Sequence, residues 1–315
     1  MSHGSDTYDW SIAGNGAVGM TLAWHIHRSG QRVCLLTREE QPNPLKLQYQ
    51  FNDEKPKKWS CPTQSQPGED APITRFIVAT KAFSVADVLA RWAPALAKNA
   101  RVYLMQNGRD FLPESALLPS HHVHFIVNSG IASYRSDARS VVQTAMQPVL
   151  VGDEEGSPHP KPEVAADLDL LEQAGIHCTW TNDIHEHHWV KLAVNAAINP
   201  LTVIFDCNNG ELLKNSQAVA IMSDLHKEGS AILKKLGVSH REDELRELIE
   251  HVISSTSENI SSMLQDYREG SGRNELEYIM SPLIREAEKH EIDVPVLLEV
   301  HSRANARFKA IATPQ

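Results

Sequence analysis

The sequence predicts an α/β amino-terminal domain followed by an all-α carboxy-terminal domain. Three observations predict this class. Strand-like and helix-like segments alternate through the first half, a glycine-rich turn follows the first strand-like run, and long helical patterns replace strands after about Ile184. A chain of 315 residues is long enough for two domains. We therefore place a first domain at residues 1–184 and a second at residues 185–315.

Apolar, β-rich runs alternate with helical patterns in the first half, which predicts a parallel sheet with helices on both faces. The predicted strands are Tyr8–Ala13, Gln31–Thr37, Ile73–Thr80, Arg101–Met105, His122–Val127 and His177–Thr181, with an extended region over Tyr134–Val151. The predicted helices are Ala17–Ser29, Ser84–Lys98 and Val164–Gly175. The alternating run LKLQYQF, at residues 45–51, interrupts this pattern and predicts a small hairpin or an excursion of the chain.

Long helical patterns dominate the second half. They begin at Trp189 and continue as Gly210–Leu236, Arg241–Asp266, Asn274–His290 and Pro295–Ala310. No internal repeat or low-complexity segment interrupts them.

Composition and charge exclude several classes of partner. The net charge is −10 and no long run of Lys or Arg stands out, which argues against binding to nucleic acid or to an anionic membrane surface. No apolar signal core and no apolar stretch long enough to span a bilayer are found, so the cytoplasm is the expected location. The four cysteines form no CxxC pair or disulfide framework. The 16 histidines lack known metal-ligand spacing, so no metal site is predicted, and His25 and His27 are expected at the surface of the first helix.

The glycine-rich turn has the form GxGxxG and lies between the first predicted strand and the first predicted helix. Its residues are Gly14, Asn15, Gly16, Ala17, Val18 and Gly19. Glycines permit a tight turn and close backbone approach, and the amino terminus of the following helix can receive a pyrophosphate. The alternative is a glycine turn without a ligand. The position between strand and helix favours a Rossmann-type dinucleotide-binding domain.

The end of the second predicted strand bears on which dinucleotide binds. An NAD site usually has Asp or Glu there to hold the ribose hydroxyls. This strand ends at Arg38, and an arginine suits the 2′-phosphate of NADP. Glu39 and Glu40 follow directly and support the competing interpretation, an NAD site. Lys81, after the next strand, is either a second cation for the 2′-phosphate or a solvated loop lysine.

The stretch WVKLAVNAAINPLT, at residues 189–202, carries a polar stripe. Steps of four residues place Lys191, Asn195 and Asn199 on one face of a helix whose other faces are apolar. One interpretation is an amphipathic helix with its polar face in solvent. The narrowness of the stripe favours a site instead, because a desolvated ammonium is a stronger acid and a stronger electrostatic partner.

The chain resembles the ketopantoate reductase family, and the resemblance extends in order from the first strand to the last helix. The matching segments are 14–19, Lys81-Ala82, Gln106-Asn107-Gly108, WVKLAVNAAINPLT, Asn208 to Leu212, SENISSMLQD at 257–266, NELEYI at 274–279 and HEIDVP at 290–295. The resemblance implies NADPH-dependent reduction of 2-dehydropantoate to (R)-pantoate, a step toward pantothenate and coenzyme A.

The resemblance also implies roles for particular residues. Lys191 would be the catalytic lysine and Glu275 its carboxylate partner. Substrate would be bound by Asn107, Asn195, Asn199, Asn209 and Ser262. The cofactor NADPH would be bound by Gly14 to Gly19, Arg38, Lys81 and Asn107. These residue types suit the chemistry, since hydride arriving at a ketone places negative charge on oxygen, which a nearby cation can stabilise and then protonate.

One departure from the family pattern bears on substrate preference. Where the family commonly has NGMG or NGLG, this chain has Asn107-Gly108-Arg109-Asp110, which adds two charges beside the cofactor loop. Two rival functions follow: an NADP-dependent reductase of another 2-oxo acid, and a non-catalytic NADP(H)-binding sensor. Retention of Lys191, Glu275 and the amides argues against a sensor, which needs no proton donor. The expected partner is a small 2-oxo acid, and the protein is expected to be a monomer or a homodimer.

Overall fold

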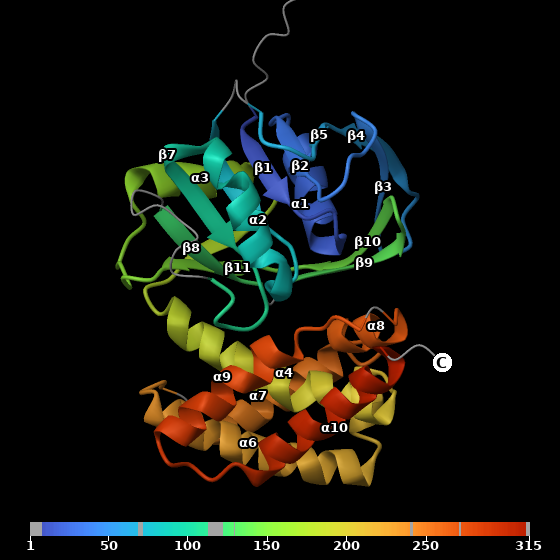
Figure 1. Ribbon diagram of the computed structural model, residues 1–315, viewed down its shortest axis with the longest axis vertical. Coiled ribbons are helices and arrows are strands. Elements are labelled where there is room, and N and C mark those ends of the chain that lie inside the picture. The colour runs from blue at the N-terminus through green and yellow to red at the C-terminus, as the bar shows by residue number, and fades with distance from the viewer. Residues whose placement is uncertain are drawn as a thin grey trace, which may run out of the picture. The chain divides into compact units, whose positions relative to one another are not determined.

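The computed structural model describes residues 8–68, 72–112, 122–128, 130–239, 242–270 and 272–312. The chain forms two compact units. The sheet unit contains Met1–Gln106 and Leu112–Ile184, and the helical unit contains Asn107–Phe111 and His185–Gln315. Residues 1–7, with which the predicted first domain begins, lie outside the described part. A mixed α/β unit and a helical unit confirm the predicted fold class (Figure 1).

In the larger sheet of the sheet unit, the order of the strands reverses at β1, which has β2 on one side and β6 on the other. Its eight strands run in the order β12-β11-β8-β7-β6-β1-β2-β5. Strand β1 pairs in parallel with both β2 and β6, so the carboxyl ends of these three strands share one edge. The strands are β1 Trp10–Ala13, β2 Val33–Leu36, β5 Thr63–Gln64, β6 Ile73–Val78, β7 Leu96–Leu104, β8 His122–Val127, β11 Val149–Asp153 and β12 Cys178–Trp180.

The described part of this unit contains three α-helices: α1 at Ala17–Arg28, α2 at Val85–Trp92 and α3 at Pro162–Gln173. The predicted helix Ser84–Lys98 is wrong in its last part. Helix α2 ends at Trp92, a short 3-10 turn follows at Ala93–Ala95, and strand β7 begins at Leu96. Pro94 lies in this turn and has no N–H with which to continue a helical hydrogen-bond pattern.

A second, four-stranded sheet, ordered β4-β3-β10-β9, covers helix α1. Its strands are β3 Leu45–Phe51, β4 Lys57–Cys61, β9 Ile131–Asp137 and β10 Ser140–Met146. The predicted hairpin is confirmed by the antiparallel pairing of β3 with β4. The expectation for His25 is wrong: this residue is only 7% exposed, and its Nε2 lies 2.8 Å from Gln143 Oε1 of β10. The second sheet covers a helix face that the local sequence marks as polar.

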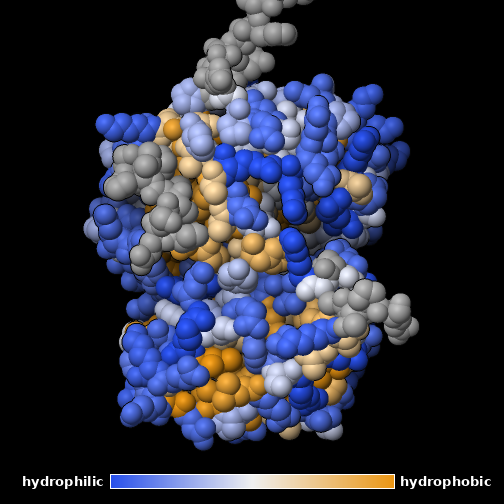
Figure 2. Space-filling view, viewed as in Figure 1, coloured by the Kyte–Doolittle hydropathy of each residue, from blue (hydrophilic) through white to orange (hydrophobic). Residues whose placement is uncertain are grey.

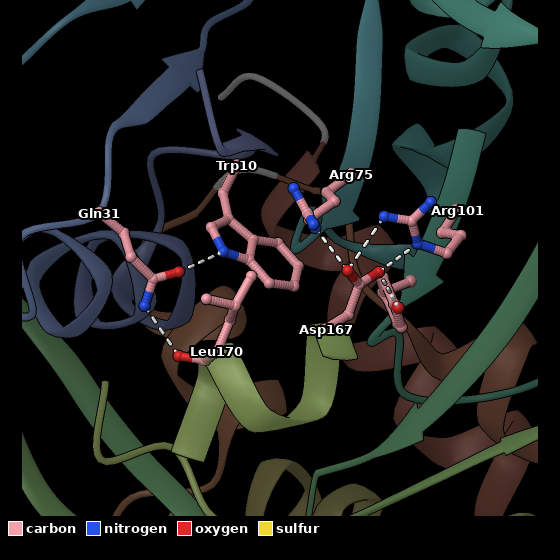
Figure 3. Close-up of polar contacts among 7 residues, drawn as sticks. Trp10, Gln31, Arg75, Arg101, Asp167 and Leu170 are labelled. Atoms are coloured by element: carbon pink, nitrogen blue, oxygen red, sulfur yellow. Dashed lines mark hydrogen bonds and ion pairs between the residues drawn. The ribbon is translucent and has the colours of Figure 1, made fainter. Parts of the chain in front are cut away.

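A buried ionic cluster ties helix α3 to the larger sheet (Figure 3). The side chain of Asp167 is fully buried, and its carboxylate accepts hydrogen bonds from Arg75 of β6 and Arg101 of β7. Tyr103 donates to Asp167 Oδ2 at 2.7 Å, and burial raises the pKa of this tyrosine. Beside the cluster, Trp10 packs under the Arg75 guanidinium, which lies 5.8 Å from the ring centroid. A buried carboxylate held by two cations stabilises the fold only while all partners are present.

The helical unit is built around α4 (Ile184–Phe205), whose apolar side chains enter one continuous core. The other helices are α5 Asn209–Leu212, α6 Ser216–Lys235, α7 Glu242–Ser255, α8 Ser262–Arg268, α9 Leu276–Lys289 and α10 Pro295–Ala312. Predicted helices 210–236 and 241–266 are wrong as single elements, since each divides in two. Asn215 caps α6 by accepting from the backbone of Gln217 and Ala218, and the Ser261 hydroxyl caps α8.

The face drawn in Figure 2 is mostly hydrophilic, with separate hydrophobic areas. Few large apolar side chains are exposed among the described residues; they are Tyr134, Leu213, Val219 and Leu298. Among the helices that the structure describes, none is long and apolar enough to cross a bilayer.

Candidate functional site

The glycine turn joins β1 to α1, and its three glycines have different surroundings. Gly14 has φ +113° and a Cβ there would lie 2.9 Å from Ala79 O, while a Cβ on Gly19 would lie 1.9 Å from Gly14 O. These two glycines are therefore required by packing. A Cβ on Gly16 would meet nothing within 4 Å, so the backbone there borders open space.

Gly16 also caps helix α1, and no side chain accepts from the N–H groups of the first turn. That turn contains no acidic residue. Exposed N–H groups and the positive end of the helix dipole favour an anion. The residues present thus fit the pyrophosphate of a dinucleotide.

Arg38 and Lys81 follow the carboxyl ends of β2 and β6, the two strands that flank β1. The parallel pairing places both residues at the edge of the sheet that carries the glycine turn. Arg38 is exposed, and its carbonyl accepts from Arg91 Nη1 at 2.7 Å, which fixes the backbone there. A cation at this edge can bind a 2′-phosphate.

Gln106 supports the same edge and was not singled out as a site residue from the sequence. It is 3% exposed, and its Nε2 donates to the carbonyls of Val78 at 2.8 Å and Thr80 at 3.0 Å. These bonds hold the segment that leads into Lys81. A glutamine directly after an apolar strand was the available signal, because a buried amide needs partners.

Lys191 and Glu275 lie together in the helical unit. Lys191 is on α4, and Glu275 is the residue that precedes α9 and is only 4% exposed. Burial lowers the pKa of Lys191 to about 8, and the Glu275 carboxylate opposes this shift. An ammonium with this pKa is mostly protonated near neutral pH and gives up its proton more readily than an ordinary lysine, so it can act as a proton donor.

Asn195 and Asn199 continue the stripe along α4, at steps of about 6 Å along the helix axis. Asn195 is half-buried and Asn199 is 9% exposed. Next to them, Thr202 donates to the carbonyl of Asn199 at 2.7 Å and lies 2.6 Å from the Ser261 hydroxyl. This tether brings the start of α8, and with it Ser262, to the end of the polar stripe.

Thr202 and Ser261 are the residues of this arrangement that sequence reasoning missed. Ser261 Oγ accepts from Leu264 N at 3.0 Å, the usual geometry of a helix cap. Because Thr202 donates to Asn199, Ser261 donates its hydroxyl proton to Thr202. The pair of serines before an apolar helix was the signal that could have identified the cap.

Asn209 and Asn107 are held differently from the residues of the stripe. Asn209 is 7% exposed, and its Nδ2 donates to Thr256 Oγ1 at 2.8 Å, which ties α5 to the turn after α7. Asn107 is half-buried and belongs to the helical unit with Lys191. In the described part of the chain, no three His, Cys, Asp or Glu side chains are grouped as metal ligands.

Two family models match most of the chain. The model described as ketopantoate reductase PanE/ApbA matches residues 10–156, and the model of the ketopantoate reductase PanE/ApbA C terminal matches residues 183–307. Ketopantoate reductases are oxidoreductases that use NADPH.

Curated relatives and solved structures agree with the models. The chain is 30% identical to the 2-dehydropantoate 2-reductase of Salmonella typhi, over 96% of this chain and 97% of that protein. It is also 30% identical to the 2-dehydropantoate 2-reductase of Archaeoglobus fulgidus, over 90% and 92%. A PanE/ApbA family ketopantoate reductase from Ralstonia eutropha JMP134 has the same fold, with a TM-score of 0.83 and 22% identity over 96% and 99% of the two chains.

A second solved structure with this fold belongs to an enzyme with a different name. A ternary complex of D-mandelate dehydrogenase with NADH and anilino(oxo)acetate matches with a TM-score of 0.81 and 22% identity, again over 96% and 99% of the two chains. At this identity the match concerns the fold alone.

Proposed function

Because the chain belongs to the ketopantoate reductase family, we propose that it reduces 2-dehydropantoate to (R)-pantoate with NADPH, in the cytoplasm. The observation that carries this proposal is the half-buried Lys191 beside Glu275, with its pKa lowered by desolvation, at the start of a stripe of amides on α4. A sensor that only binds the nucleotide has no need for a partly desolvated, ionisable proton donor next to a carboxylate.

Bound NADPH supplies the hydride. The Lys191 ammonium donates a hydrogen bond to the keto oxygen, stabilises the negative charge that develops there, and delivers the proton. Glu275 holds the lysine in its protonated form, as its effect on the pKa of Lys191 indicates. The amides of Asn195 and Asn199 bind hydroxyl and carboxylate oxygens without competing for the proton, and the Ser262 hydroxyl donates to the substrate carboxylate. Gly14 to Gly19 hold the pyrophosphate, and Arg38 and Lys81 hold the 2′-phosphate.

The test is a spectrophotometric assay of purified protein with NADPH and 2-dehydropantoate. We expect loss of NADPH absorbance that depends on 2-dehydropantoate, with (R)-pantoate as the product. A protein that binds NADPH but turns over no 2-oxo acid would be the sensor, and this proposal would fail.

A related reductase of another 2-oxo acid is the second candidate, and two observations favour it. Arg109 and Asp110 add two charges where the family commonly has uncharged residues, and D-mandelate dehydrogenase shares the fold. The same assay with pyruvate, 2-oxoisovalerate and phenylglyoxylate decides between the two. A higher kcat/KM for one of these acids than for 2-dehydropantoate would replace the first proposal by the second.

Replacement of Arg38 by glutamine should separate the two nicotinamide cofactors. Charge-assisted hydrogen bonds to a phosphate are strong, so Arg38→Gln should raise the Kd of NADPH by roughly 10- to 100-fold. The Kd of NADH, which has no 2′-phosphate, should stay unchanged in a fluorescence titration. Arg32→Gln, just before the other end of β2, is the matched control and should alter neither Kd. Equal losses for both cofactors would assign Arg38 to a shared part of the nucleotide.

The pH profile should report the Lys191 ammonium. Its pKa is about 8, so the proton donor is present below this pH and is lost above it. We expect kcat/KM for reduction to be level below about pH 8 and to fall about tenfold per pH unit above it. Because the Glu275 charge raises the pKa of Lys191, Glu275→Gln should move the inflection to lower pH. An unchanged inflection in this variant would separate Glu275 from the proton donor.

A further inference from the structure

The segment Asn107–Phe111 belongs to the helical unit, although the chain on both sides of it belongs to the sheet unit. It follows strand β7 and includes Arg109 and Asp110. Four contacts of this segment reach α4 or α9, the helix that carries Lys191 and the helix that Glu275 precedes.

The first contact is a close backbone approach between Gly108 and α9. Gly108 has φ +94°, and a Cβ there would lie 2.4 Å from Tyr278 O. No other residue fits without displacing the segment or the helix. The segment therefore lies directly against the helix backbone, one turn after Glu275.

The second contact is a hydrogen bond from the segment to a backbone carbonyl of α9. Arg109 N donates to Tyr278 O at 2.9 Å. In an α-helix this carbonyl would accept from the N–H of residue 282. Residue 282 is a proline inside the helix and has no N–H. Pro282 thus leaves the Tyr278 carbonyl available to the segment.

The third and fourth contacts are made by charged side chains. The Asp110 carboxylate forms an ion pair with Arg285, two turns further along α9. The Arg109 guanidinium lies 4.4 Å from the centroid of the Trp189 ring, a cation–π contact with α4. Trp189 is two residues before Lys191, so this contact reaches the catalytic helix beside its lysine.

We propose that Asn107–Phe111 is a staple that joins α4 to α9, with Arg109, Asp110 and Pro282 as positioning residues. The staple holds Asn107 in a fixed position relative to Lys191 and Glu275. This inference rests on the proposed function for its catalytic consequence, but the staple itself is a property of the helical unit.

Two side chains of the staple, those of Asp110 and Arg285, can be changed without disturbing the core, because each is more than half exposed. They border an open pocket of about 510 Å³ that is also lined by Arg109, Glu277, Tyr278 and Ser281. Pro282 is buried in α9, so the Tm of its variant is measured beside its activity.

The key variant is Pro282→Ala, which restores an N–H that competes for the Tyr278 carbonyl. Hydrogen–deuterium exchange of the Arg109 amide should accelerate by on the order of tenfold. Misplacement of Asn107 should lower kcat by on the order of 10- to 100-fold, with the Kd of NADPH unchanged. The Tm should stay equal or rise, because proline is unfavourable inside a helix. A merely structural role would lower the Tm instead.

Two further variants test the side-chain contacts. Arg109→Met removes the cation over Trp189 and should lower kcat, whereas Arg109→Lys keeps a cation there and should restore part of it. The matched control is Arg303→Met, which removes an arginine that lies 5.9 Å from the ring centroid of Phe205, at the other end of α4. This control should leave kcat unchanged.

A readout independent of turnover is the titration of Lys191, followed by NMR of its labelled Cε carbon. In Pro282→Ala and Arg109→Met, the midpoint should move from about 8 toward the ordinary lysine value of about 10.4. The staple would be overturned if Pro282→Ala left both the exchange rate of the Arg109 amide and the titration midpoint of Lys191 unchanged. It would also be overturned if the Arg109 amide exchanged faster in this variant while kcat stayed unchanged. If the wild-type protein did not reduce 2-dehydropantoate, the proposed function would fail, while the exchange and titration results would still decide the staple.

Discussion

Lys191→Ala should lower kcat for reduction of 2-dehydropantoate by about 10²- to 10⁴-fold, the range expected for loss of a general acid. The variant loses the cation that stabilises the developing alkoxide and the proton that the alkoxide takes up. Nucleotide binding should persist, because the glycine turn, Arg38 and Lys81 belong to the sheet unit. The measurements are steady-state kinetics and a fluorescence titration with NADPH.

Two further variants sharpen this prediction. Lys191→Arg keeps a positive charge but cannot give up its proton near neutral pH, so it should remain almost inactive if proton donation is essential. Lys227→Ala removes an exposed lysine of α6 that pairs with Asp224, and should leave kcat unchanged. Turnover by Lys191→Ala within about fivefold of the wild type would remove Lys191 from the role of proton donor.

Asp167→Asn should destabilise the protein by about 3–5 kcal/mol, the usual result of breaking a buried ion pair from one side. The amide leaves two guanidinium groups without their counter-charge, and the Arg101 side chain is only 9% exposed. For a unit of this size, the loss corresponds to a fall in Tm on the order of 10 °C. Calorimetry or denaturant unfolding followed by circular dichroism would measure it.

The matched control for this prediction lies on the same helix. Asp169 is an exposed residue of α3, and Asp169→Asn should change stability by no more than about 0.5 kcal/mol. Arg101→Met in the Asp167→Asn background should recover part of the loss, since it removes an unpaired buried cation. A loss below about 1 kcal/mol for Asp167→Asn would mean that water or other groups solvate the arginines in its place.

Much of the candidate site could be predicted because its signals are local. The GxGxxG turn lies between a strand and a helix that both exist; Gly14 and Gly19 have the close packing that the motif requires, and Gly16 borders open space. The stripe on α4 follows from helical periodicity alone. The roles of these residues in binding and catalysis remain predictions, which the variants above test.

Other parts of the site could not be predicted, because they depend on residues far apart in the chain. Pro282 is visible in the sequence, but that the freed Tyr278 carbonyl accepts from Arg109 follows only from the tertiary structure. The hydroxyl pair of Thr202 and Ser261 is separated by 59 positions. Neither contact has a periodicity or spacing from which it could be inferred.

The sequence by itself determined the alternation of strands and helices, the glycine turn and the polar stripe, because each depends on backbone preferences and side-chain period over a few residues. Tertiary structure decided which faces are covered. It buried His25 under a second sheet, gave Asp167 its two arginines, and assigned 107–111 to the helical unit. The physical reason is that burial and ion pairing depend on which distant surfaces meet, and a local pattern of polar and apolar residues does not specify its partner.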